Sequence, residues 1–147
     1  MKNEKEILQL AKEYNWGTVI INYIDQANEI IDKYYKEFDD DAWTRVSIVE
    51  NLSLNNIRKF KDKLNWISFT DAYNYIDDNF VEEFKDYIDW TSIPFKKSIS
   101  DNIIEKYFDL IDWKWVDEYI ESHKDLITVS DRELKYIKEY KDRKEKK

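Results

Sequence analysis

Apolar residues recur along this chain at the spacing of one face of an α-helix. In each of three stretches an aliphatic residue is followed by an aromatic one three positions later and by another aliphatic one seven positions later. Positions i, i+3 and i+7 fall on one side of a helix. The stretches are Ile57, Phe60 and Leu64; Val81, Phe84 and Ile88; and Ile104, Tyr107 and Ile111. The pattern predicts three amphipathic helices.

Tryptophans recur along the chain at a nearly constant interval. Trp43, Trp66, Trp90 and Trp113 are separated by 23, 24 and 23 residues, and an apolar residue stands three positions after each of them. A sequence period of this length is typical of tandem repeats built from short helices. We therefore predict two helices per repeat of about 23 residues, stacked as a compact α-solenoid or helical bundle, with the four tryptophans in equivalent buried positions.

Residues that start helices recur in the same register. Their side chains accept hydrogen bonds from the free N–H groups of a helix's first turn. They are Ser53, Asp77 and Ser100 before the apolar stripes, and Asn65, Asp89 and Asp112 directly before a tryptophan. Further on, Ser130 and Glu133 form a capping-box pattern, which predicts one more helix.

The register divides a single predicted domain, residues 1–147, into four stretches. We expect an irregular N-terminal unit over 1–42, regular repeats over 43–113 and a longer terminal unit over 113–140. Terminal repeats depart from the pattern because one of their faces has no neighbour to cover. Residues 141–147 are basic and lack any apolar side chain. We expect this tail to fray.

Composition favours an all-α fold. One glycine and one proline in 147 residues leave little material for hairpin turns, and aromatic residues, at 16%, supply large side chains for a core. There is no cysteine, which fits a reducing compartment. We find no apolar run long enough to span a bilayer and no signal-like start. The sequence therefore predicts an all-α protein of the cytoplasm, away from membranes.

The charge is negative and unevenly distributed. The net charge is −8, but the segment from Lys135 to Lys147 carries +4, which leaves −12 on residues 1–134. An acidic body repels phosphates, so we expect no direct binding of nucleic acid. Two interpretations remain open. The acidic surface occupies a basic groove that normally holds nucleic acid, or it only keeps an aromatic-rich protein in solution.

One acidic position recurs with the repeat. Asp62, Asp86 and Asp109 each stand four residues before a tryptophan, in the predicted last turn of the striped helix, where the helix dipole disfavours a negative charge. One interpretation is structural: the carboxylate accepts a hydrogen bond from an indole N–H or from the next helix. The other is functional: the carboxylates form an exposed ladder for a basic partner.

Three aromatic residues occupy positions that are polar in sister repeats, which predicts exposure. Exposed aromatic side chains are enriched at protein interfaces. Trp115 stands where Arg45, Ser68 and Ser92 stand in earlier repeats, Phe108 where Lys61 and Lys85 stand, and Tyr87 where Lys63 stands. These three residues are our candidate aromatic patch. The alternative is that the final segment folds back and buries Trp115 and Phe108.

The chain offers no catalytic motif. His123 is its single histidine, and no glycine-rich phosphate loop, zinc-ligand spacing or nucleophile motif accompanies it. A lone histidine in a charged stretch is typical of a surface position. We expect no catalytic residue, no metal and no cofactor.

The segments Leu64-Asn65-Trp66, Ile88-Asp89-Trp90 and Ile111-Asp112-Trp113 resemble a tryptophan-centred short helical repeat of uncharacterised proteins from bacteriophages and large DNA viruses. The resemblance runs from roughly Trp43 to Tyr140. In those relatives the unit often reads leucine, aspartate, tryptophan, two variable residues, an aliphatic residue and serine. Trp43 to Ser47 keeps the serine, whereas Thr70, Pro94 and Asp117 replace it. The resemblance implies a helical fold and a viral or prophage origin, and it carries over no catalytic residue.

These observations lead to one functional hypothesis and one alternative. The hypothesis is a non-catalytic protein-binding protein, a phage-encoded inhibitor of a bacterial defence complex such as a CRISPR effector, with an acidic, nucleic-acid-mimicking surface. Its partner would be a protein with a basic nucleic-acid-binding groove in the host cytoplasm. The alternative is a structural or self-assembling helical-repeat scaffold. Because the inhibitory role is an analogy between folds, it awaits a test on the protein itself.

Overall fold

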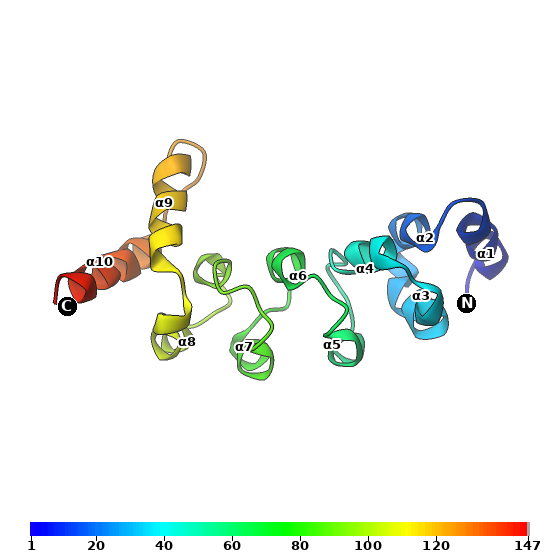
Figure 1. The fold of residues 1–147 in the computed structure, drawn as a ribbon, viewed down its shortest axis with the longest axis horizontal. Coiled ribbons are helices and arrows are strands. Elements are labelled where there is room, and N and C mark those ends of the chain that lie inside the picture. Colours follow the sequence, from blue (N-terminus) through cyan, green and yellow to red (C-terminus); the bar gives the residue numbers. More distant parts are fainter. Residues whose placement is uncertain (147) are drawn as a thin grey trace. The chain divides into compact units, whose positions relative to one another are not determined.

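The computed structural model describes residues 1–146, and every regular element within them is a helix (Figure 1). The predicted all-α class is confirmed. None of these helices is both long and apolar enough to span a bilayer. The α-helices are α1 (Glu4–Glu13), α2 (Trp16–Asn22), α3 (Ala27–Tyr34), α4 (Asp40–Val46), α5 (Leu54–Phe60), α6 (Trp66–Ala72), α7 (Asp78–Phe84), α8 (Asp101–Lys106), α9 (Trp113–His123) and α10 (Asp131–Glu145). Four 3₁₀ turns join them: η1 (Ile24–Gln26), η2 (Tyr35–Glu37), η3 (Ile93–Phe95) and η4 (Phe108–Leu110).

The predicted helix starts are largely confirmed. The side chains of Ser53, Asp77 and Ser100 accept hydrogen bonds from the backbone N–H groups three residues later, at 3.2, 2.8 and 3.4 Å. Asn65 and Asp112 do the same for α6 and α9. The capping box of α10 is formed in both directions. These caps satisfy N–H groups that a helix cannot pair internally.

The predicted α-helix after Asp89 is wrong. Trp90 lies in a turn, and only the 3₁₀ turn η3 follows it. The Asp89 carboxylate accepts hydrogen bonds from the Thr91 N–H at 3.2 Å and the Thr91 hydroxyl at 2.8 Å. Pro94 explains the difference, because it has no N–H to donate to the carbonyl of Trp90 and its ring would clash there.

The helices form two compact units, described here separately. The first unit comprises Met1–Tyr75 and Phe84–Ile88, and the second comprises Ile76–Glu83 and the chain from Asp89 onward. In the first unit α2 packs on α1 and α4, and α3 packs on α5. Apolar side chains fill the space between these helices. Its core includes Ile7, Val19, Ile20, Ile30, Ile31 and Ile57.

Buried and half-buried polar side chains pair with the residue that precedes a later helix. The Ser47 hydroxyl is fully buried, donates to the Trp43 carbonyl at 2.8 Å and accepts the Asn65 N–H at 2.8 Å. On α3, the Asn28 side-chain oxygen accepts the Ser53 N–H at 2.8 Å. In the second unit, Asp78 accepts the Ser100 N–H at the same distance. In each case the residue that donates its N–H group directly precedes a helix: α6, α5 and α8, respectively.

Helices α8, α9 and α10 form most of the second unit. α10 packs on α9, and Tyr136 of α10 stacks on Trp113 with ring centroids 5.8 Å apart. α10 continues to Glu145, within the tail expected to fray, and Lys147 lies outside the described residues. Fraying of this tail stays a prediction. The extension is stabilised by Arg143, which hydrogen bonds Glu139 at 2.5 Å and lies 3.9 Å from the Phe108 ring centroid.

The four repeating tryptophans are not equally covered. Trp43 and Trp113 are buried as predicted, whereas Trp66 and Trp90 are half-buried. Trp66 and Trp113 share one interaction: each indole N–H donates to the carbonyl five residues earlier, at 2.7 Å for Lys61 and 2.9 Å for Phe108. The indole thereby pairs a carbonyl just beyond the end of the preceding α-helix, where carbonyls lack the donor that a continuing α-helix would supply.

Replacing Ser47 by alanine should destabilise the protein. The Asn65 N–H would lose its acceptor in a largely dry site, which costs about 1–3 kcal/mol. Urea unfolding followed by circular dichroism measures this change. Thr44→Ala is the matched control, because the exposed Thr44 hydroxyl lies on the same helix and bonds only the Asp40 carbonyl. Its effect should stay within about 0.5 kcal/mol. Equal effects of the two substitutions would contradict the role assigned to Ser47.

Candidate binding surface on α9

Helix α9 carries Trp115 on its outer side. Asp112 caps the helix by accepting the Trp115 N–H at 3.0 Å. Trp113 and Trp115 are separated by about 200° around a helix, so they cannot face the same core. Trp113 is 3% exposed and Trp115 is 41% exposed. The predicted exposure of Trp115 is therefore confirmed.

Trp115 is the first member of a stack of rings along α9. Tyr119 lies 5.1 Å from Trp115 with an interplanar angle of 17°, and His123 lies 4.2 Å from Tyr119 at 23°. Residues four apart are neighbours on a helix surface, which brings the three rings together. We call Trp115, Tyr119 and His123 the α9 aromatic stack. The sequence analysis missed Tyr119, although its spacing from Trp115 is visible in the sequence.

Two contacts hold the stack in place. The edge of the Phe95 ring packs against Tyr119, with centroids 5.7 Å apart. The Nδ1 atom of His123 lies 2.9 Å from the Tyr119 carbonyl and 2.9 Å from the Ser122 hydroxyl. His123 is thus half-buried against a ring rather than free in solvent. These contacts restrict the orientations of Tyr119 and His123.

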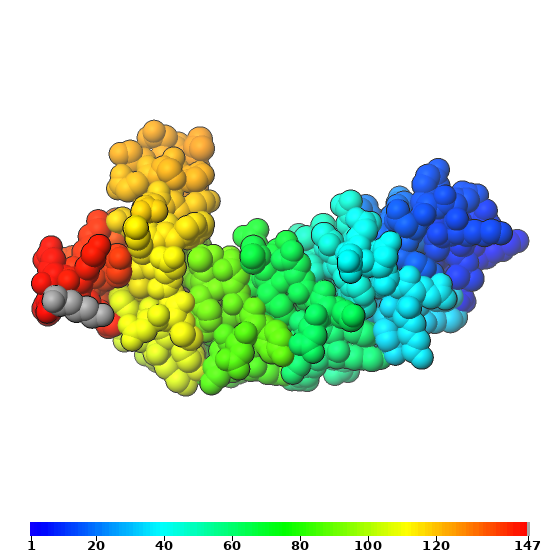
Figure 2. Space-filling model, in the orientation of Figure 1, coloured from blue at the N-terminus to red at the C-terminus, as the bar shows by residue number. Residues whose placement is uncertain are grey.

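The C-terminal half of α9 extends past its neighbours in the second unit. In Figures 1 and 2 this part of the chain, yellow to orange, stands clear of α8 and α10. Leu126, just beyond the helix, is strongly exposed. This end of α9 is accessible to another molecule.

The charges around the stack differ in whether they are already paired. Asp117 lies 3.3 Å from Lys141, and Glu121 lies 3.6 Å from Lys124. Among the described residues, Glu118 is exposed and makes no ion pair or hydrogen bond, and the same holds for Lys114. Glu118 follows Trp115 by three residues, so it is the free carboxylate beside the indole.

The predicted exposure of Phe108 is wrong. Its side chain is 4% exposed, stacks on Trp113 at 4.9 Å and lies 6.4 Å from Tyr136. Helix α10 folds back and covers it, and Arg143 closes the remaining face. The alternative interpretation, in which the final segment folds back and buries both residues, is therefore correct for Phe108 but not for Trp115. The polar residues at the corresponding positions, Lys61 and Lys85, gave no warning, because α10 follows only the last of these stretches within the described residues.

Tyr87 serves the first unit rather than the α9 surface. It is half-buried, its ring lies 5.5 Å from that of Trp66, and its hydroxyl donates to Asp62 at 3.3 Å. The Lys61 ammonium lies 5.3 Å from the ring centroid. Tyr87 belongs to the first unit and Trp115 to the second, so the predicted aromatic patch is not gathered within one unit.

The three repeating aspartates are exposed and lie beyond the ends of α5, α7 and α8, not in their last turns. Asp109 is 3.7 Å from Arg143, and Asp86 has no ion pair or hydrogen bond within the described residues. The expected carboxylate–indole bond is wrong for Trp66 and Trp113, whose N–H groups bond backbone carbonyls. A carboxylate ladder for a basic partner stays a prediction.

A partly buried polar contact joins α10 to the start of α8. Arg132 donates to the Ile99 carbonyl at 2.5 Å, and its Nε lies 3.4 Å from the Asp101 carboxylate. Tyr136, one turn later, is fully buried. Burial raises the pKa of Tyr136 above its ordinary value, and the nearby Asp101 carboxylate raises it further. The phenol therefore stays neutral, and the α10 face that covers Phe108 is locked to α8.

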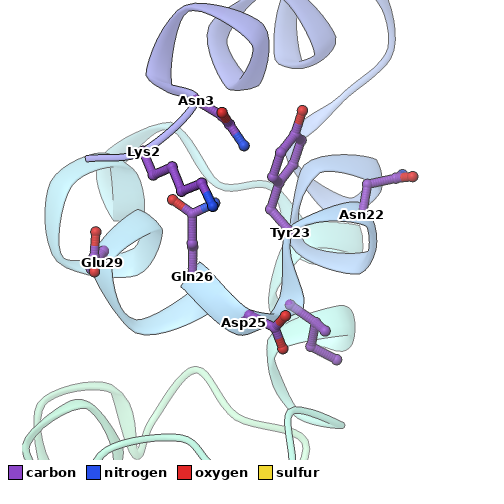
Figure 3. Close-up of a pocket in the computed structure, with 8 residues that line it drawn as sticks. Lys2, Asn3, Asn22, Tyr23, Asp25, Gln26 and Glu29 are labelled. Carbon is purple, nitrogen blue, oxygen red and sulfur yellow. The ribbon is translucent and has the colours of Figure 1, made fainter.

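A polar cleft lies in the first unit, between the start of α1 and the α2–η1–α3 segment (Figure 3). Its volume is about 520 Å³, and the Gln26 side-chain oxygen is buried there without a hydrogen-bond partner. In Figure 3 Lys2 and Gln26 point toward each other, whereas Asn22 and Asp25 point away. The cleft thus lacks convergent acid–base groups. Its lining is Lys2, Asn3, Asn22, Tyr23, Ile24, Asp25, Gln26 and Glu29.

No family model matches the chain, and comparisons with curated proteins and with solved structures found no match.

The different exposures of Phe108 and Trp115 predict losses of stability of different size on truncation to alanine. Phe108→Ala removes a fully covered ring and should cost about 3–5 kcal/mol. Trp115→Ala loses mainly one ring stack and part of its burial, and should cost at most about 1.5 kcal/mol. Chemical denaturation of both variants measures the difference. A larger loss for Trp115→Ala than for Phe108→Ala would show that α9 is oriented differently from the description above.

Proposed function

We propose that this chain is a non-catalytic protein-binding protein and that its contact surface is centred on Trp115. The observation that carries the proposal is the large exposed indole, which is held in one orientation by Tyr119 although the fold does not need it as core. Tryptophan is among the residues most enriched at binding hot spots. A ring that is already ordered loses little conformational entropy on binding.

We further propose that the partner is basic and that the protein inhibits it. The support is the −12 net charge of residues 1–134 and the exposure of Asp62, Asp86 and Asp109. An acidic surface attracts a groove that normally holds nucleic acid. Together with the resemblance to phage repeat proteins, this leads to an inhibitor of a bacterial defence complex, such as a CRISPR effector, acting in the host cytoplasm.

We also infer that the chain is a tandem array of units of about 23 residues. The support is the recurrence of equivalent interactions: the caps Ser53, Asp77 and Ser100, and the indole bonds of Trp66 and Trp113 to the carbonyl five residues earlier. Such arrays bury their cores between neighbours and leave their outer faces free for recognition.

Trp115→Ala should weaken partner binding by about 30-fold or more, which corresponds to about 2 kcal/mol for a hot-spot residue. Isothermal titration with a partner captured from host lysate by the unmodified protein measures the change. Ile67→Ala is the control, because Ile67 is a more exposed apolar residue on α6 of the first unit. Its binding should equal that of the parent. An unchanged affinity of folded Trp115→Ala would refute a Trp115-centred surface.

Raising salt from about 0.1 to 0.5 M should slow association far more than it speeds dissociation, because the Debye length falls and long-range attraction weakens. Stopped-flow mixing of protein and partner gives both rates. Salt-independent association would argue against a basic partner.

A ternary complex of protein, partner and nucleic acid in a gel shift would refute competition for the nucleic-acid groove. Defined oligomers of the isolated protein in light scattering would favour the scaffold alternative instead.

A further inference from the structure

We propose that the α9 aromatic stack receives an arginine side chain of the partner, with the guanidinium over the open face of Trp115 and its N–H groups donating to Glu118. The proposal rests on the protein-binding function above and adds the chemistry that the surface recognises. It follows from three features of α9: an indole that is 41% exposed and stacks on one ring only within the described residues, a free carboxylate beside it, and the pairing of the neighbouring charges.

The open face of Trp115 is the first feature. One face of the indole stacks on Tyr119, and no other ring or cation lies against Trp115 within the described residues. The electron-rich face of tryptophan attracts cations more strongly than that of tyrosine or phenylalanine. Elsewhere in the chain such faces are already used: Arg143 lies 3.9 Å from the Phe108 centroid, and Lys59 lies 4.3 Å from that of Tyr35. Trp115 lacks such a cation of its own.

The free carboxylate of Glu118 is the second feature. Residues three apart on a helix lie on the same side, about 60° from each other, so Glu118 borders the indole. The pairing of its neighbours is the third. Asp117 and Glu121 already have the cations Lys141 and Lys124, whereas Glu118 makes no ion pair within the described residues. Lys114 lies on the same side of the helix, four residues before Glu118, and makes no ion pair there either.

Arginine fits this arrangement better than lysine does. A guanidinium is planar, stacks on an aromatic face and still presents N–H donors at its edge to a carboxylate. An ammonium is a compact, strongly hydrated charge that gains less from stacking. An uncharged apolar side chain would leave Glu118 beside it without a partner. The combination of indole face and adjacent carboxylate therefore selects a guanidinium.

The test uses two short peptides, Gly-Arg-Gly and Gly-Lys-Gly, each blocked at both ends. Two-dimensional ¹H–¹⁵N NMR follows the Trp115 indole N–H signal, identified as the one that disappears in Trp115→Phe. We expect a saturable shift with the arginine peptide and about 3-fold or more weaker binding of the lysine peptide. Equal binding of the two peptides, or no saturable shift at this indole, would overturn the proposal.

Two charge-matched variants locate the carboxylate. Glu118→Gln should weaken binding of the arginine peptide by about 3- to 5-fold. An exposed ion pair contributes up to about 1 kcal/mol, which corresponds to this change in affinity. Glu121→Gln removes the same charge from the same helix, but at a position about 120° from Trp115. It should leave the affinity unchanged. Equal weakening by both variants would reduce the effect to general electrostatics and overturn a specific Glu118 contact.

The same variants separate this inference from the proposed function. If Trp115→Ala abolishes binding of the intact partner while Glu118→Gln does not weaken it, the protein-binding surface stands and the arginine contact is wrong. If the arginine peptide binds as expected but Trp115→Ala leaves partner binding intact, the arginine site stands and the proposed function is wrong. Loss of partner binding in both variants, with Glu121→Gln unaffected, supports both.

Discussion

The structure depends on satisfying the ends of very short helices. Helices α2 to α8 have six to eight residues each, so most of their N–H and C=O groups belong to the first or last turn. Isolated helices of this length are not stable in water. The helix starts are capped by the side chains of Ser53, Asp77, Ser100 and Asn65. Three of these capping residues also have their own backbone N–H paired, by the side chains of Asn28, Asp78 and Ser47.

This constraint explains why tryptophan recurs rather than another large apolar residue. An indole fills the space between consecutive helices and also carries one hydrogen-bond donor. In Trp66 and Trp113 that donor pairs a carbonyl near the end of the preceding helix. A phenylalanine at either position would fill the space but leave the carbonyl without this donor. One side chain therefore both fills the space between helices and pairs a backbone carbonyl.

The sequence predicted local features well because they depend on neighbouring residues. The caps at Ser53 and Asn65, the capping box of α10 and the opposed orientations of Trp113 and Trp115 all follow from helical geometry. The prediction failed where a local rule overrode the repeat: Pro94 prevents the helix after Asp89. That failure was avoidable, since the proline is visible in the sequence.

Other features could not be predicted because they depend on segments distant in sequence. Nothing near Phe108 shows that Arg143 and Tyr136 cover it, and nothing near Gln26 shows that the start of α1 makes a cleft beside it. The α9 aromatic stack could be predicted in part. The spacing of Trp115, Tyr119 and His123 predicts a stack on one side of a helix, whereas its exposure depends on where α10 packs.

The packing of α10 separates stability from recognition in the second unit. Because α10 packs its Tyr136 on Trp113 and Phe108, the core on that side of α9 is complete without Trp115. The outward side of α9 then carries an exposed indole and an exposed glutamate, Trp115 and Glu118, that are not part of the core. Residues under no structural demand are those a surface can change to suit a partner. We therefore propose contact with another molecule, rather than folding, as the reason for a large indole at this position.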